Sequence, residues 1–203
     1  MISESLKIIK AELGRHIGNL NDNGSEKDVV LGNISQLEND ETGILKDKVV
    51  ITLVNSEEES ALKNSSSFYR SNGALTFQNP PVYLNLYLLF TANWPGNYEV
   101  ALSRLSSVME FFQGKNIFTI QNSPNSIADQ ESFTDPDFIE LRLILDMYTM
   151  TFEQINHLWG SLGGKQIPFL MYKMRLVKID SDRVIREGKV IDETQNGTGV
   201  IDN

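Results

Sequence analysis

Residues 79–94 read NPPVYLNLYLLFTANW, the longest apolar run in the chain. Apolar side chains recur at every second position from Val82 to Ala92, and most positions between them carry rings, an amide or a hydroxyl. A period of two places the two sets on opposite faces of a β-strand. The two prolines lack the amide hydrogen that a ladder needs, and the turn residues WPGN at 94–97 close the run. We therefore predict a strand at the centre of a sheet.

The two faces of this strand differ in chemistry. The even-numbered positions are all apolar, so we expect this face to lie against helices. The odd-numbered face carries Tyr83, Asn85, Tyr87, Leu89 and Thr91. A mixture of this kind needs semi-polar partners, and we expect another subunit or a wet cleft beside it.

Three segments place apolar residues every three or four positions, which is typical of amphipathic helices. They predict helices at residues 2–18, 98–114 and 152–162. Asn97 and Thr151 are the expected N-caps, the second in a capping box with Gln154. We expect Gly114, in a left-handed conformation, to end the second helix, and the Gly163-Gly164 pair to end the third.

Shorter runs of alternating or β-branched residues predict further strands. These lie at residues 28–34, 47–55, 116–120, 138–148 and 169–179. In the last of them Lys173 and Arg175 alternate with apolar residues, which favours an edge strand or a solvated face. Polar segments at 56–73 and 121–137 predict surface loops, and Glu187-Gly188 predicts the turn of a small hairpin. We expect a body at residues 1–180 and a polar tail at 181–203.

Composition excludes several functions. The chain has 203 residues, no cysteine and a formal net charge of −9. Phosphate-backbone recognition needs a surplus of lysine and arginine, so we expect no nucleic-acid partner. We see no signal peptide and no membrane-spanning run, and expect no insertion into a membrane.

Catalytic and cofactor motifs are missing from the sequence. Gly160 to Lys165 is glycine-rich and ends in lysine, but it ends a predicted helix where a phosphate loop begins one. The two histidines, His16 and His157, stand far apart, which makes a zinc site improbable. The run Glu57-Glu58-Glu59 is read as a solvated loop or helix start rather than as an acid/base pair. A mixed α+β domain without an active site and without a cofactor is expected to work through its surfaces.

Several ordered motifs nevertheless point to a family. They are VLGNI at 30–34, VVITLVN and EEE within 49–59, NPPVYLNLYLLF at 79–90, FFQGK at 111–115 and NHLWGSLGGK at 156–165. Over roughly residues 3–180 the chain resembles the N-terminal domain of tube-terminator, or cap, proteins of extracellular contractile injection systems. Those are phage-tail-like particles such as the antifeeding prophage and the Photorhabdus virulence cassette. Some members carry an additional C-terminal domain, whose role is not transferred to this chain.

The resemblance implies an α+β fold like that of a phage tail terminator, with a single mixed, mostly antiparallel sheet and about three helices packed on it. It implies a structural, non-enzymatic protein that forms a hexameric ring, closes the inner tube and gives the last sheath ring a hold. The implied partners are other copies of the chain, the tube protein and the sheath protein. Assembly in the cytoplasm, followed by incorporation into the particle, is the implied localisation.

Sheath subunits of such systems join neighbours by strand exchange, so residues 169–179 or the tail hairpin are candidates for receiving a strand. Phe111 lies off the stripe of its helix and is expected to be exposed or to pack on a neighbour. Seven side chains are considered for contacts between subunits. Tyr83, Tyr87, Trp94 and Phe111 are each also open to ordinary core packing, and the others are Tyr172, Lys173 and Arg175 of the strand at 169–179.

Two alternatives stay open. One is another component of the same particle, such as a baseplate adaptor or a connector to a membrane anchor. The other is an enzyme with an unrecognised site that uses Glu57 to Glu59, His157 or Lys165.

Overall fold

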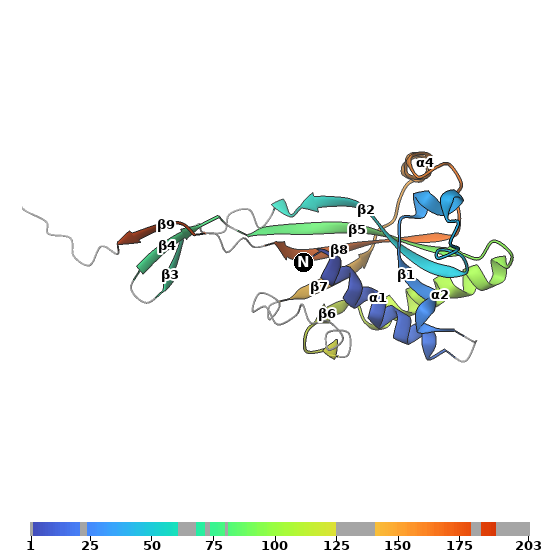
Figure 1. Cartoon of the computed structure of the whole chain (residues 1–203), viewed down its shortest axis with the longest axis horizontal. Helices are drawn as coiled ribbons and strands as arrows, with labels where there is room; N and C mark the ends of the chain where they lie inside the picture. The colour runs from blue at the N-terminus through green and yellow to red at the C-terminus, as the bar shows by residue number, and fades with distance from the viewer. Residues whose placement is uncertain are drawn as a thin grey trace, which may run out of the picture.

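A computed structural model describes residues 2–20, 24–60, 68–71, 74–79, 81–124, 141–179 and 184–189. Its main sheet has six strands in the spatial order β1-β2-β5-β8-β7-β6 (Figure 1). In that order they are β1 (Val29–Leu31), β2 (Lys48–Glu58), β5 (Val82–Asn93), β8 (Phe169–Ile179), β7 (Arg142–Met147) and β6 (Ile117–Thr119). The helices are α1 (Ile2–Gly18), α2 (Tyr98–Gly114) and α4 (Phe152–Ser161), with 3-10 turns η1 (Glu26–Asp28) and η2 (Ile34–Asn39).

β5, the strand predicted at the centre, lies between β2 and β8 and pairs antiparallel with both. Among the described strands β1 and β2 form the one parallel pair, so the sheet is mixed and mostly antiparallel. The expected α+β fold is thereby confirmed.

The even-numbered face of β5 packs on α1 and α2, as its apolar character predicts. Leu86, Leu88 and Phe90 are fully buried in one cluster with side chains of both helices. The Phe90 ring lies 5.1 Å from that of Phe112 and 5.5 Å from that of Tyr172, both in edge-to-face arrangements. Figure 1 shows both helices on the same side of the sheet.

The odd-numbered face is covered at one end by the chain itself. Leu89 packs there with Val50 and Met171, beneath Ile34 of η2 and Trp159 of α4. No second subunit is needed to bury this half of the face, so the expectation of an outside partner is wrong for it. The other half is polar and is described below.

Local signals set the helix ends mostly as predicted. Asn97 accepts a hydrogen bond from the Val100 amide, and Thr151 forms the full capping box with Gln154. Gly163 and Gly164 have φ values of 107° and 83°, a region that suits residues without a Cβ, and the chain turns out of α4 there. Gly114 is different, because it is the last helical residue and is not among the described glycines with positive φ.

The structure corrects three other predictions. β8 lies between β5 and β7, so it is an interior strand and not an edge; the alternative of a solvated face holds, because Arg175 is exposed and Lys173 is partly exposed. β2 continues to Glu58, which makes Glu57 and Glu58 strand residues instead of loop residues. Val184–Lys189 form one strand, β9, so no hairpin turn occurs at Glu187-Gly188. Most of the loop expected at 121–137, the start of the strand expected at 138–148 and the residues after 189 lie outside the described part of the chain.

A second sheet of three strands was not anticipated. It has the order β3-β4-β9, with β3 at Phe68–Ser71 and β4 at Ala74–Gln78, and all pairs are antiparallel. Since β4 precedes β5 and β9 follows β8, the β4–β9 pair continues the line of the β5–β8 pair beyond the prolines at 80 and 81. Figure 1 shows this sheet projecting past the end of the main sheet.

Candidate interaction surface

The uncovered half of the odd-numbered sheet face carries polar and charged side chains. A row of directly paired residues crosses four strands there, from Asn55 through Tyr87 and Lys173 to Asp146. Directly opposed residues on neighbouring strands project to the same face, so the row forms one surface. Its neighbours extend this surface, which we call the polar sheet face: Asn55, Glu57, Asn85, Tyr87, Asp146, Tyr148, Lys173 and Arg175.

Tyr87 connects the members of this surface. Its hydroxyl donates to Glu57 Oε2 at 2.8 Å, and its ring packs edge-on against that of Tyr148 with centroids 5.2 Å apart. Lys173 Nζ lies 5.6 Å from the centroid of the Tyr87 ring. Burial raises the pKa of the Tyr87 phenol to about 12, and the hydrogen bond to the Glu57 carboxylate adds to this rise because it favours the neutral phenol.

The charged side chains of the surface alternate in sign. Arg175 pairs with Asp146 at 2.5 Å between Nη2 and Oδ2, with side-chain exposures of 44% and 42%. Exposed pairs of this kind contribute at most about 1 kcal/mol. These charges therefore stabilise the fold little and remain accessible to a partner.

Asn85 lies within one irregularity of the strand ladder and close to a second. The register shifts between Leu53 and Asn55 on β2 and between Leu84 and Leu86 on β5. Asn85 is 3% exposed, and its Nδ2 donates to Glu59 Oε2 at 2.9 Å, while its Oδ1 has no hydrogen-bond partner among the described residues. Bulges often re-aim side chains at functional positions, and a buried acceptor without a donor costs free energy.

The structure brings together only some of the residues predicted for contacts. Tyr87, Lys173 and Arg175 share the polar sheet face, and Tyr83 lies further along β5, half-buried. Trp94 lies at the other end of β5, beside a separate cavity of about 360 Å³.

Phe111 and Tyr172 do not belong to any open surface. Phe111 is 9% exposed and packs with His16 and Phe118, and Tyr172 is 4% exposed and contacts Phe112. Both take the core-packing role, so they are left out of the interface.

Five members of the surface were not among the predicted contact residues: Asn55, Glu57, Asn85, Asp146 and Tyr148. Asn55, Glu57 and Glu59 follow one another at a spacing of two, which is the spacing of one strand face. This alternation was available in the sequence, but the three consecutive glutamates were read as a loop.

The two histidines considered as metal ligands and Lys165, considered for catalysis with His157, lie apart from this surface. His16 is half-buried against Phe111, while His157 is exposed on α4. Lys165 is exposed in the segment between α4 and β8. Over the described ranges, no group of three or more His, Cys, Asp or Glu side chains is placed to hold a metal ion. No helix in this part of the chain is long and apolar enough to cross a membrane.

Comparison with solved structures defines the class of fold. The whole chain aligns with the sheath/tube terminator of an extracellular contractile injection system, PVC, seen by cryo-electron microscopy in the extended state. The TM-score is 0.61 at 15% identity, and the alignment covers 100% of this chain and 64% of that one. The tube-terminating cap of the anti-feeding prophage gives a TM-score of 0.49 at 16% identity, covering 74% of this chain and 49% of that cap.

The family follows from the sequence itself. The family model of the Pvc16 N-terminal domain matches residues 6–193. The chain therefore belongs to the Pvc16 N-terminal domain family, which confirms the resemblance to tube terminators of contractile injection systems. A search of curated proteins found no match.

Proposed function

We propose that this protein is a structural cap that terminates the inner tube of a phage-tail-like contractile injection particle and holds its last sheath ring, acting as a hexameric ring. The observation that carries the proposal is the fold that the whole chain shares with a sheath/tube terminator. Membership of the Pvc16 N-terminal domain family supports it independently.

The role proposed here is assembly and not catalysis, without a cofactor, a nucleic-acid partner or insertion into a membrane. Residues 1–180 form the body of the cap and residues 181–203 a tail, whose Val184–Lys189 segment pairs with β4. Assembly takes place in the cytoplasm, and the protein then remains part of the particle.

The polar sheet face is the surface we assign to contact with the tube protein. Alternating charges at Asp146, Lys173 and Arg175 suit a partner of complementary charge pattern, and such charges mainly determine specificity and association rate. Interior β8 offers no edge there for a sheath strand, so strand exchange at 169–179 is not part of the proposal.

The test uses native mass spectrometry of the purified protein mixed with tube protein. The double substitution Lys173→Glu and Arg175→Glu reverses both positive charges of the surface. We expect it to weaken tube binding on the order of tenfold or more, since like charges at an interface oppose association. The matched double control Lys7→Glu and Lys46→Glu changes the net charge equally at two exposed residues away from this face.

Equal losses in both double variants would show that only net charge matters and would remove the polar sheet face from the proposal. If the wild-type protein does not bind tube protein at all, the cap function is refuted and the adaptor or connector function is favoured.

A further inference from the structure

The two edges of the main sheet differ in whether they can accept another strand. At the β6 edge, Asn122 occupies the main-chain groups that a strand would use. Its Nδ2 donates to Ile117 O at 2.9 Å, and its Oδ1 accepts from Thr119 N at 2.8 Å. The β6 edge is thus closed by a side-chain amide.

The opposite edge, at β1, has no such cover among the described residues. The Gly32 amide donates to Ile51 O, and β1 pairs with β2 in register Val30↔Val50. The main-chain N–H and C=O groups of successive residues point to opposite sides of a strand. Those of Val30 and Gly32 therefore point toward β2, and those of Val29 and Leu31 point away from it. The Val29 amide donates to Glu26 O. The outward groups that remain are the Val29 carbonyl and both polar groups of Leu31.

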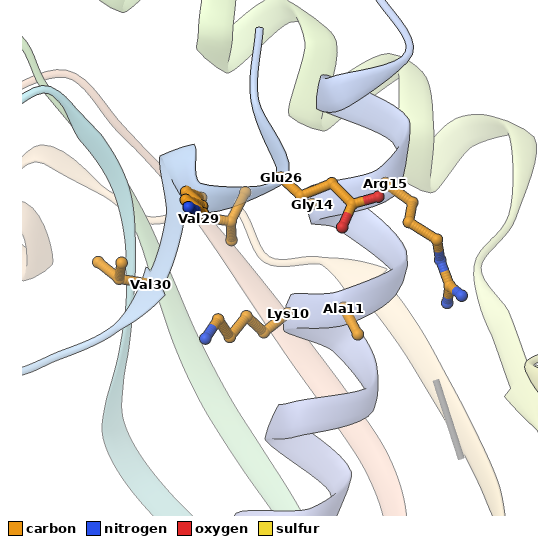
Figure 2. Close-up of a pocket in the computed structure, with 8 residues that line it drawn as sticks. Lys10, Ala11, Gly14, Arg15, Glu26, Val29 and Val30 are labelled. Atoms are coloured by element: carbon orange, nitrogen blue, oxygen red, sulfur yellow. The ribbon is translucent and has the colours of Figure 1, made fainter. Parts of the chain in front are cut away.

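A cavity of about 460 Å³ lies beside this edge, between β1 and α1. Val29 and Val30 line it from β1, and Ala11, a small side chain, lines it from α1. Figure 2 shows Lys10 reaching from α1 toward β1 across this space. We call it the β1 groove.

The charge of the β1 groove is opposite to that of the chain as a whole. Lys10, Arg15 and Lys27 line it, with Glu26 as the one acidic lining residue, whereas the formal net charge of the chain is −9. Arg15 is paired with Glu12 and points away from β1 in Figure 2, so Lys10 and Lys27 supply the positive charge of the groove. Val29 is already fully buried, so Val30 is the one valine of the lining that an added strand could still cover. The occupant should therefore be extended, partly apolar and acidic.

Residues 190–203 of this chain have that chemistry. They read VIDETQNGTGVIDN, with three acidic residues, no lysine or arginine, and two Val-Ile-Asp sequences. Valine and isoleucine favour strands, and four extended residues span about 13 Å, which suffices to run along a three-residue strand.

We infer that the β1 groove binds residues 190–203 of a second copy of this chain by strand addition. The occupant comes from a second copy because β9, which leads into this segment, lies at the end of the molecule away from β1 (Figure 1). A contact that joins one site to a different site on the next copy is heterologous and can close a ring. The inference therefore rests on the proposed ring and names its contact.

Disulfide trapping between two single-cysteine chains tests the inference, since the natural chain contains no cysteine. One chain carries Ala11→Cys in the groove, and the other carries Ile191→Cys or Ile201→Cys. After mixing and mild oxidation we expect a mixed disulfide with at least one of the two tail positions. Its yield should exceed on the order of tenfold that of the control Lys7→Cys, which lies on α1 outside the groove. If Ala11→Cys impairs folding, Lys27→Cys replaces it.

Charge supplies the second readout. Adding Lys10→Glu to the Ala11→Cys chain should reduce the trapped yield several-fold, and adding Lys7→Glu should leave it unchanged. The inference would be overturned if the yield of mixed disulfide exceeded the control at neither tail position. It would also be overturned if Lys10→Glu left that yield unchanged. A chain that carries both Ala11→Cys and a tail cysteine supplies a further check. If it forms only an intramolecular disulfide, the inference is also overturned.

Native mass spectrometry and tube binding of the same variants separate this inference from the proposed function. If rings form on tube ends but no disulfide forms between the groove and the tail, the contact alone is refuted. If disulfide-linked rings form but do not bind tube ends, the cap function alone is refuted.

Discussion

Replacing Asn122 with alanine tests the closed edge at β6. The substitution removes the two side-chain hydrogen bonds to Ile117 O and Thr119 N, and also the acceptor of the Ser123 hydroxyl at 3.0 Å. Hydrogen bonds contribute about 0.5–1.5 kcal/mol each, net of exchange with water. Since Asn122 is exposed, we expect Asn122→Ala to lower the free energy of unfolding by about 1–2 kcal/mol. For a chain of this size that corresponds to a fall in Tm of roughly 2–8 °C.

Urea unfolding measures the free energy, and hydrogen exchange measures the Thr119 amide directly. The amide should exchange faster in Asn122→Ala, because its acceptor is gone. Asn122→Asp keeps the acceptor for Thr119 but loses the donor to Ile117, so its stability should lie between wild type and alanine. Gln121→Ala, at the exposed neighbouring position, is the matched control. Equal stability of Asn122→Ala and Gln121→Ala would refute the reasoning.

Three further changes probe the core, the polar sheet face and a helix end. Phe90→Ala, in the centre of the ring cluster, should cost about 3–5 kcal/mol in thermal or urea unfolding, and a cost below about 1 kcal/mol would contradict the assigned core. The phenol of Tyr87 has a pKa of about 12 in the folded protein and about 10 in the unfolded chain. Its contribution to the free energy of unfolding is therefore fully present below pH 10 and is lost as the pH rises through 12. Because Tyr87 is only partly buried, the wild-type advantage over Tyr87→Phe should shrink by about 1 kcal/mol across that range, and an advantage that grows would have the wrong sign. Gly164→Ala, at φ 83°, should destabilise by about 1 kcal/mol, whereas Gly160→Ala inside α4 should be neutral or stabilising; the reverse order in the same assay would refute the assigned turn.

The central strand and the helix caps were predictable because their signals are local. The alternation from Val82 to Ala92 is long enough to define both faces of β5, and Asn97 and Thr151 stand directly before their helices. The role of Phe111 was harder to predict, because α2 packs on both the sheet and α1. A side chain off one apolar stripe is then buried against the second neighbour.

The interior position of β8 was not predictable from β8 alone. Its Lys173 and Arg175 look like edge residues along the chain, but the structure places Asp146 and Tyr87 beside them on the neighbouring strands. Pairing of this kind depends on residues far away in the sequence. The same holds for β9, whose partner β4 comes more than a hundred positions earlier.

The closed β6 edge depends on a single asparagine in a polar segment, and nothing in the sequence distinguishes Asn122 from its neighbours Gln121 and Ser123 as an edge cover. Edges without such a cover are where added strands bind, so the contrast between β6 and β1 is a three-dimensional property. The open β1 edge could be located only after the strand order was known.

The proposed cap function is tested by whether the protein stops the growth of tubes. Tube protein is allowed to polymerise, this protein is added, and more tube protein follows, with tube lengths measured by negative-stain electron microscopy. We predict a six-fold ring at one end of each tube and no further growth from that end. Tubes that keep elongating from both ends, without rings at either, would contradict the cap function.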